Sequence, residues 1–420
     1  MKWIYGKQDW KTFERGQENC YLMTNGLGGY SSLTMMGSAA RNDHAFLMAC
    51  TKAPNNRYNM IHRLAEQLET GRGVYTMSSQ EFADRSREKG YRYLTEFVYE
   101  DTPVWRFLIN GVEIEKEAAL KQDENTAAVC YRVTNRSGKD VRLTVTPFYQ
   151  FAPKGGGEEL NGTFRHLAGR VEKGHLGLYY MTNGCVTEIP ETKEQYYYSY
   201  DACDGRKSTG SAEACHRISL DVESGGSSTL SVVFSVERDF AEEQTRSAVD
   251  VAESVIQAMK EGRKKQELQS GLCDETARFL VKSAHQFVSR RKSTGGKTIL
   301  AGFPFFEDWG RDTMIALPGV CLSTRQYEDA RSILRTFARY ERHGLMPNLF
   351  PEGKSEPRYN TADAALLFIN CVWLYYRASS DAAFIEEMYP VMERIITSYQ
   401  NGTDYDIRMD DDCLITAGSG

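Results

Sequence analysis

The chain has 420 residues, enough for two or three domains, and its 41% hydrophobic and 26% charged residues are typical of a protein with large cores. Its net charge of −6, from 51 basic and 57 acidic residues, comes without a basic block, so we expect no nucleic-acid partner. Ten cysteines without a CxxC pair and seven scattered histidines predict a reduced protein with no metal site. No segment resembles a signal peptide or a membrane span, so we expect a cytoplasmic protein with no membrane partner.

The first part of the chain, from about residue 18 to about 235, predicts strands. β-branched and aromatic residues alternate there with polar ones between turn signals, most clearly at 126–135, 140–151 and 228–237. Many short antiparallel strands favour a large sandwich. We therefore expect an N-terminal β-sandwich domain over residues 1–238.

Three segments partly match known ligand-binding motifs. LMTNGLGGYSS (22–32) is Gly-rich but lacks dinucleotide-binding spacing, so we expect a turn between strands. STGGKT (293–298) has Arg291 where a phosphate loop needs glycine, and we expect a turn between helices. TDYDIRMDDDC (403–413) lacks the glycine and glutamate of a calcium loop and predicts a solvated hairpin. Segment 153–210 is expected to hold long loops.

The pattern changes to helices after about residue 239. Residues rich in Ala, Glu, Lys and Gln predict a helical linker over 239–272, and apolar residues then recur at helical spacing. We expect a helical domain over 273–420. Its predicted helices lie at 274–292, 324–344, about 361–378 and 380–402, the last with Pro390 causing a kink or a late start.

The stretch FFEDWGRDTMIAL (305–317) places acids and an arginine around Trp309, between apolar residues. Charged residues are seldom buried without partners, so this cluster is either a solvated helix start or a polar site in a cavity wall. In the first case Asp312 lies near a helix start and helps to cap it, while Arg311 forms a surface ion pair.

Three motif segments resemble bacterial and archaeal glycogen debranching enzymes of the amylo-α-1,6-glucosidase type. They are YLMTNGLGGYSSLTMMGSAARNDHAFLMA (21–49), WGRDTMIALPG (309–319) and HGLMPNLFPEGKSEPRYNTADAALLF (343–368). The RNDHAF portion departs from the family form, which leaves Arg41 and His44 without an assigned role. The resemblance implies a multidomain chain, β then α: an N-terminal β-supersandwich followed by the first part of an (α/α)6 toroid. It also implies glycogen or a related α-glucan as partner, α-1,6-linked glucose stubs hydrolysed with inversion, and no cofactor.

A glucose ring bound in a toroid must exchange water for fixed hydrogen-bond partners, because unpaired buried polar groups cost about 1–3 kcal/mol each. Asp accepts from hydroxyls, Arg donates in a fixed fork, and Trp offers an apolar face. The loop containing HGLMPNL and the helix start at RYNTAD add an amide and a second set of Arg, aromatic and acid. The predicted substrate-binding residues are Trp309, Arg311, Asp312, Asn348, Arg358, Tyr359, Asp363 and Asp308, with Glu307 as a possible rim contact.

Inverting hydrolysis needs two carboxyl groups, roughly 6.5–9.5 Å apart. The resemblance implies that the general acid and base follow the ITAGSG segment (415–420), and twelve toroid helices need on the order of 200–300 residues. We therefore expect an apparently truncated toroid and a chain that is inactive alone, with Asp312 or Asp363 as the fallback acid. A glucoamylase- or trehalase-type hydrolase and a non-catalytic glycan-binding protein remain alternatives.

Overall fold

The computed structural model describes residues 2–155, 160, 162–242, 246–350 and 356–417. The chain forms two compact units. The first, called the sandwich unit here, comprises Met1–Asn25, Gly29–Thr51 and Arg57–Gly262; the second, the helical unit, comprises Gly26–Gly28, Lys52–Asn56 and Arg263–Gly420. This division differs from the predicted boundaries in that two short pieces of the N-terminal half belong to the helical unit.

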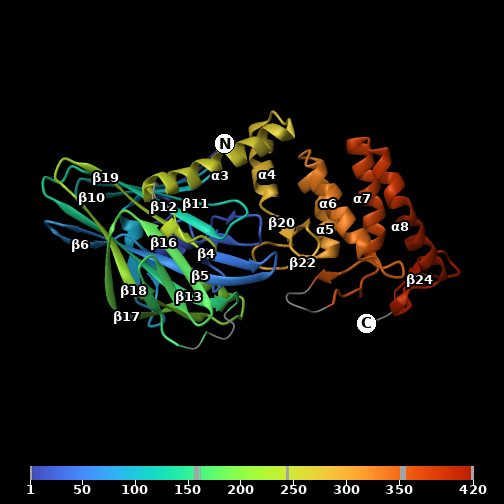
Figure 1. Cartoon of the computed structure of the whole chain (residues 1–420), viewed down its shortest axis with the longest axis horizontal. Coiled ribbons are helices and arrows are strands. Elements are labelled where there is room, and N and C mark those ends of the chain that lie inside the picture. The colour runs from blue at the N-terminus through green and yellow to red at the C-terminus, as the bar shows by residue number, and fades with distance from the viewer. Residues whose placement is uncertain (1, 156–159, 161, 243–245, 351–355, 418–420) are drawn as a thin grey trace. The chain divides into compact units, whose positions relative to one another are not determined.

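The sandwich unit is built from two large antiparallel sheets (Figure 1). The nine-stranded sheet has the order β1 (Trp3–Gly6), β9 (Leu94–Tyr99), β10 (Pro103–Ile109), β11 (Val112–Leu120), β12 (Thr126–Asn135), β19 (Ser227–Ser235), β16 (Leu176–Thr182), β15 (Arg170–Lys173) and β14 (Arg165–Leu167). The eight-stranded sheet has the order β17 (Cys185–Tyr197), β18 (Thr209–Val222), β13 (Val141–Pro153), β5 (Asn56–Thr70), β4 (Ala45–Lys52), β3 (Tyr30–Ser32) and β2 (Met23–Thr24), with β6 (Gly73–Thr76) paired to β5. Shorter elements are α1 (Phe13–Gln17), β7 (Ser79–Glu81), β8 (Arg87–Lys89), η1 (Gly90–Arg92), α2 (Ser199–Cys203) and η2 (Phe240–Glu242).

A single apolar core takes side chains from both sheets, as expected for sheets packed face to face. Strand β10 illustrates the alternation: Trp105 and Phe107 are buried, whereas Arg106 and Leu108 between and after them are exposed. The prediction of a large N-terminal β region is confirmed, and LMTNGLGGYSS does turn between β2 and β3.

The prediction for segment 153–210 was wrong. Apart from 156–159 and 161, which lie outside the described residues, most of it forms β14, β15, β16, β17 and α2. Tyr196 and Leu178 are buried in the sandwich core, and β16, which carries Leu178, pairs with β19 rather than with the next strand only. Sequence alternation in this segment is weak because much of β17 is exposed on both faces.

Helix α3 (Ala248–Ser270) confirms the predicted helicity of the linker but is not a free connector. Its apolar residues Val251, Val255 and Ile256 pack against Ala128 and Val233 of the nine-stranded sheet in a small core of their own. The first part of α3 therefore belongs to the sandwich unit, whose main segment ends at Gly262.

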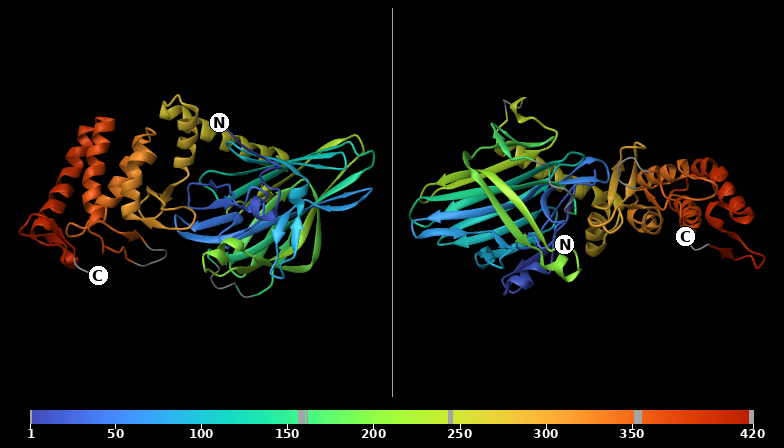
Figure 2. Two further views of the ribbon diagram at one scale, coloured as in Figure 1. Left: turned by 180° about the vertical axis from the view of Figure 1, so that it is seen from behind. Right: turned by 90° about the horizontal axis from the view of Figure 1, so that it is seen from below.

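In the helical unit, the helices α5 (Gly310–Leu317), α6 (Tyr327–Arg339), α7 (Asp363–Ser379) and α8 (Ala382–Asn401) lie side by side (Figures 1 and 2). Helix α5 packs on α7, and α6 packs on both α7 and α8 around one core that includes Phe337, Phe368 and Phe384. These described helices form an open array rather than a closed ring. The elements are α4 (Glu275–His285), β20 (Val288–Arg291), β21 (Gly296–Ile299), β22 (Asp308–Trp309), α5 (Gly310–Leu317), η3 (Pro318–Leu322), α6 (Tyr327–Arg339), β23 (Leu349–Phe350), α7 (Asp363–Ser379), α8 (Ala382–Asn401), η4 (Asp404–Asp406), β24 (Arg408–Met409) and β25 (Ile415–Thr416).

Two helix predictions needed correction. The helix predicted over 274–292 ends at His285, and the following residues form β20, which pairs with β21 so that STGGKT (293–298) is a hairpin rather than a turn between helices. Helix α8 begins at Ala382 and continues through Pro390. The acidic segment 403–413 contains β24 of the predicted hairpin, with β25 following.

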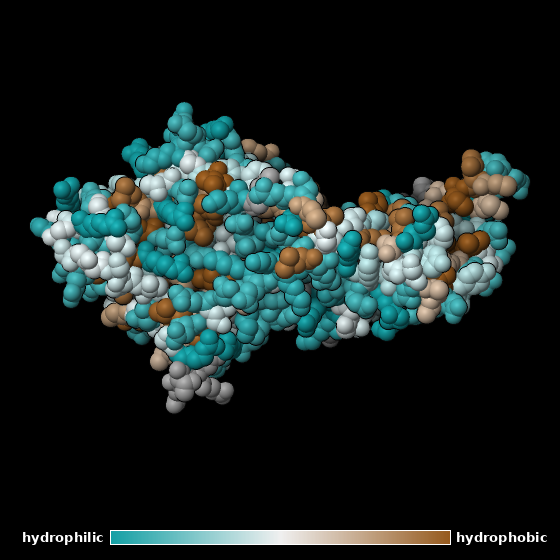
Figure 3. Space-filling view, turned by 90° about the horizontal axis from the view of Figure 1, so that it is seen from above, coloured by the Kyte–Doolittle hydropathy of each residue, from teal (hydrophilic) through white to brown (hydrophobic). Residues whose placement is uncertain are grey.

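The helical unit also exposes large apolar side chains on α5, α7 and α8, namely Ile315, Trp373, Tyr389 and Ile396. Figure 3 shows apolar patches over this unit, scattered among hydrophilic groups on the face seen there. Helix packing among the described residues thus leaves part of its apolar surface uncovered. None of the helices in the described ranges has both the length and the apolar composition to cross a bilayer.

Candidate functional site

A short backbone ladder joins the three site motifs of the helical unit. Trp309 pairs with Leu349 in the β22–β23 ladder, and the Gly310 amide donates to the Asn348 carbonyl at 2.8 Å. The Asn348 amide in turn donates to the Arg358 carbonyl at 2.6 Å. Residues from WGRD, HGLMPNL and RYNTAD are therefore adjacent in space, although nearly fifty residues separate the first from the last. Residues 351–355, which follow HGLMPNL in the same predicted loop, lie outside the described residues.

The second link is an ion pair between the starts of two helices. Arg311 in the first turn of α5 places its Nη1 atom 3.4 Å from Oδ2 of Asp363, the first residue of α7. The Thr361 hydroxyl donates to the other Asp363 oxygen at 2.5 Å. Both charged side chains are about half exposed, at 51% and 44%, so the pair contributes at most about 1 kcal/mol to stability.

Asp312 stands apart from this pair. It lies in the first turn of α5 and is exposed. The N-cap residue of α5 is Trp309, which makes no side-chain capping bond, and Asp312 has no hydrogen-bond or ion-pair partner within the described residues. The capping interpretation of Asp312 therefore lacks a hydrogen bond to support it.

Asp308 differs from the other predicted site residues because its side chain is 0% exposed. Its carboxylate forms an ion pair with Arg291 and accepts a hydrogen bond from the Thr298 hydroxyl at 2.8 Å. The carboxylate of Asp308 is therefore buried away from any ligand. Because Asp308 belongs to β22, its ion pair with Arg291 holds this strand in place. The spacing of the sequence could not reveal its partner, since Arg291 lies on another strand. Glu307, the expected rim contact, is partly exposed.

The remaining predicted residues lie on the ladder or next to it. The side-chain oxygen of Asn348 is buried and has no hydrogen-bond partner among the described residues, although the side chain as a whole is partly exposed. Arg358 is exposed, and the Tyr359 hydroxyl donates to the Tyr340 carbonyl at 2.9 Å. Burial raises the pKa of Tyr359 above its ordinary value, so this hydroxyl remains a neutral donor.

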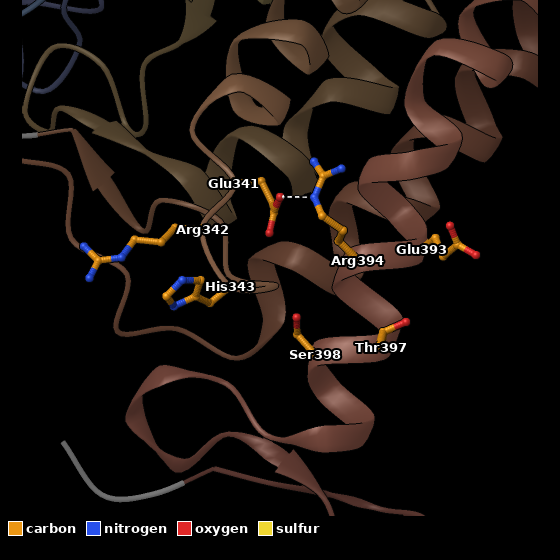
Figure 4. A pocket seen from close by; sticks show the side chains of 7 residues that line it. All are labelled: Glu341, Arg342, His343, Glu393, Arg394, Thr397 and Ser398. Atoms are coloured by element: carbon orange, nitrogen blue, oxygen red, sulfur yellow. Dashed lines mark hydrogen bonds and ion pairs between the residues drawn. The ribbon is translucent and has the colours of Figure 1, made fainter.

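A polar cleft of about 630 Å³ opens beside Tyr359, within the size range of small-molecule sites. Several of its charged groups have partners: Arg394 donates to Glu341 at 2.8 Å (Figure 4), and Arg342 lies 3.6 Å from a carboxylate oxygen of Asp404. Opposite charges nearly balance, which suits a neutral hydroxylated ligand better than an anion. Of the residues that line this cleft, the motif HGLMPNL includes only His343. Its lining residues are Glu341, Arg342, His343, Glu393, Arg394, Thr397 and Ser398.

Within the described ranges, no group of three or more His, Cys, Asp or Glu side chains is arranged to hold a metal ion. The site is instead a set of hydrogen-bond donors, acceptors and one aromatic face. Such a set can replace the hydration of a sugar ring.

Comparison with known families gives two matches. Residues 19–229 match a family described as glycogen debranching enzyme N terminal, and residues 282–420 match one described as amylo-alpha-1,6-glucosidase. Over 101 residues the chain is 41% identical to the glycogen debranching enzyme of Saccharomyces cerevisiae, which covers 21% of this chain and 6% of the yeast enzyme. The chain thus spans a small part of that relative.

Two solved structures are similar at 10% identity. A protein assigned as a kojibiose phosphorylase, from the human microbiome, matches with a TM-score of 0.54 over 98% of this chain and 60% of the other. A bacterial glucoamylase complexed with acarbose matches with a TM-score of 0.48 over 92% of this chain and 58% of the other. The first likeness concerns the fold alone, and the chain spans less than two thirds of either structure.

A β-sandwich unit followed by a helical unit agrees with these two matches, which are to the N-terminal and the amylo-alpha-1,6-glucosidase parts of one class of protein. The resemblance of the motif segments extends over both halves of the chain and agrees with both family matches. The chain belongs to the glycogen debranching enzyme family.

Proposed function

We propose that the chain forms the sugar-binding part of a cytoplasmic amylo-α-1,6-glucosidase, which hydrolyses α-1,6-linked glucose stubs of glycogen or a related α-glucan with inversion. The observation that carries this proposal is the meeting of two motifs: Arg311 of WGRD and Asp363 of RYNTAD lie 3.4 Å apart. A complete (α/α)6 toroid is part of the same proposal. The described helices α5 to α8 would supply one sector of its wall.

The chemistry of the site suits one terminal glucose. Asp312 and Asp363 accept hydrogen bonds from hydroxyl pairs, and Arg311 donates in a planar fork. Trp309 is partly exposed at the start of α5 and can offer its ring to the sugar's C–H face. Asn348, which is partly exposed next to the strand partner of Trp309, is the proposed contact for a further hydroxyl.

We assign Asp312 and Asp363 to binding rather than to proton transfer. Asp363 already lies 3.4 Å from the Arg311 Nη1 atom and accepts a hydrogen bond from the Thr361 hydroxyl, and Asp312 lies one residue beyond Arg311, so both carboxylates are placed to accept hydrogen bonds from sugar hydroxyls. On this assignment, the acid and base of the inverting reaction are other carboxyl groups. The residues described here bind the sugar and orient its glycosidic bond.

The test is sugar binding by the Asp312→Asn variant of the whole chain, measured by calorimetric titration with isomaltose or panose. Loss of a charged acceptor is worth about 1.5–3 kcal/mol, so affinity should fall roughly ten- to a hundredfold with an unchanged melting temperature. The matched control is Glu328→Gln, which removes an exposed acid from the first turn of α6. Unchanged affinity in Asp312→Asn, or equal losses in both variants, would refute the assignment.

The same titrations separate the alternatives. An amylo-α-1,6-glucosidase site should prefer panose-like α-1,6 stubs over maltose, whereas a clear preference for maltose would favour a glucoamylase-type hydrolase. A non-catalytic glycan-binding protein predicts glycogen binding by the sandwich strands and no glucose release from any longer form of the protein.

A further inference from the structure

Two short segments from among the sandwich strands belong to the helical unit: Gly26–Gly28 and Lys52–Asn56. The second connects β4 to β5 and carries Asn55, whose side chain is 4% exposed. The side-chain amide of Asn55 donates to the carbonyl of Phe350 at 3.1 Å. A residue distant in sequence is therefore bonded to β23, one of the two strands of the site ladder.

Strand β23 transmits this bond to the predicted sugar contacts. Phe350 pairs with Asp308 and Leu349 pairs with Trp309, and one residue earlier the Asn348 carbonyl accepts the Gly310 amide. A shift of the Phe350 carbonyl would therefore shift the backbone of both Trp309 and Asn348. The Arg291 guanidinium lies 4.0 Å from the Phe350 ring centroid, which fixes the same residue from a second side.

The segment that carries Asn55 is itself held in place. Gly28 adopts a φ of +92°, and a Cβ atom there would lie 2.0 Å from the Pro54 carbonyl oxygen. Only glycine allows this approach. The Gly26 carbonyl accepts from the Arg290 amide at 2.8 Å and from the Ser289 hydroxyl at 3.2 Å. Gly28 thus packs closely against Pro54, which precedes Asn55, while Gly26 is hydrogen-bonded to the strand β20.

The side chain of Asn55 contributes little to the free energy of folding. Its side-chain oxygen is buried without a hydrogen-bond partner in the part of the chain that the structure describes. The free-energy cost of an unsatisfied buried acceptor offsets most of the gain from the single hydrogen bond to Phe350. Buried polar groups left unsatisfied in this way call for an explanation beyond stability.

We propose that Asn55 is a positioning residue of the sugar site, which fixes Trp309 and Asn348 through the Phe350 carbonyl. The inference rests on the proposed function, because it concerns the geometry of that site. Binding of a rigid ring is sensitive to misplacement of its contacts by about 1 Å. The bond from Asn55 supplies a fixed point that a mobile surface loop would lack.

The experiment compares Asn55→Ala with the matched control Asn59→Ala, both in the whole chain. Asn59 is 1% exposed and donates to the His44 carbonyl at 3.2 Å, within the sandwich unit. Proteins labelled with fluorotryptophan are examined by fluorine NMR, with the Trp309 resonance assigned by Trp309→Phe. Isomaltose affinity is then measured for each variant and for Asn348→Ala alone and combined with Asn55→Ala.

In Asn55→Ala the Trp309 resonance should move or broaden without sugar, and affinity should fall about tenfold. Asn59→Ala should lower thermal stability to a similar extent with neither effect. The losses from Asn55→Ala and Asn348→Ala should be non-additive, since one acts through the other. If Asn55→Ala does not fold, Asn55→Ser replaces it, because its shorter hydroxyl cannot reach Phe350.

The outcomes distinguish this inference from the proposed function. If the wild-type chain binds no sugar, the proposed function fails, while a Trp309 resonance that moves only in Asn55→Ala still supports the positioning role. An unchanged Trp309 resonance overturns the positioning role, as do additive losses in the double variant.

Discussion

Removing the carboxylate of Asp308 tests whether this residue supports the site from inside the core. Asp308→Ala leaves the guanidinium of Arg291 buried, with a side chain only 7% exposed and no carboxylate beside it. Breaking a buried ion pair by removing one partner costs about 3–5 kcal/mol. The hydroxyl of Thr298 also loses its acceptor at 2.8 Å. We therefore expect the helical unit to lose roughly 3–5 kcal/mol of stability.

The matched variant removes both charges. Asp308→Asn keeps an acceptor for Thr298, and Arg291→Met keeps an apolar stem against Phe350 while removing the buried cation. Replacing a buried ion pair by groups of similar volume is often nearly neutral. The double variant should therefore be more stable than Asp308→Ala, by about 2 kcal/mol or more.

The assay is urea unfolding followed by far-UV circular dichroism, which reports mainly on the helices, together with isomaltose titration at low urea. A supporting role predicts that stability and affinity fall together in Asp308→Ala and recover together in the double variant. The reasoning is refuted if Asp308→Ala has the same urea midpoint of unfolding as the wild type but no longer binds sugar. Asp308 would then be a ligand contact, as the sequence suggested.

Two further perturbations test other parts of the chain. Burial lowers the pKa of His44, His62 and His216 to about 3. Below a pH of about 6.5 these histidines therefore bind protons in the unfolded chain but stay neutral in the folded one. Stability should therefore fall as the pH drops from about 6.5 toward 3, by up to about 1.4 kcal/mol per pH unit for each histidine; equal urea midpoints at pH 7 and pH 5 would contradict this. Gly310→Ala should destabilise the helical unit in thermal unfolding although alanine favours helices by about 1 kcal/mol, because its Cβ would lie 1.9 Å from the Pro347 carbonyl oxygen; a raised melting temperature would contradict the packing.

Local pattern was enough to predict the helices that carry the site. Helix α6 lies inside the predicted segment 324–344, and α7 begins within two residues of its predicted start, because a long apolar stripe at helical spacing is a strong signal. Residues 286–292 were assigned to a helix because Phe287 and Val288 continue that spacing. Their strand depends instead on pairing with β21, which no local pattern encodes.

The proximity of two candidate site residues was predictable from the motifs, although their role stays a prediction. Motif segments identified Arg311 and Asp363, and the structure brings them together. They could not identify the support beneath them. Asn55 lies 295 residues before the carbonyl it binds, and the acid Asp308 looks like its exposed neighbours until its burial is known. Long-range partners of this kind follow from tertiary packing rather than from residue spacing.

The support and the sugar contacts have different energetic roles. The half-exposed pair of Arg311 and Asp363 contributes too little to hold two helices in register, so their alignment must come from the β22–β23 ladder and from packing of α5 on α7, where the Cys371 thiol also donates to the Met314 carbonyl at 3.0 Å. A weak pair on a rigid frame can be opened at small cost. On the proposed function, Arg311 and Asp363 would exchange each other for sugar hydroxyls while the backbone that carries them stays fixed.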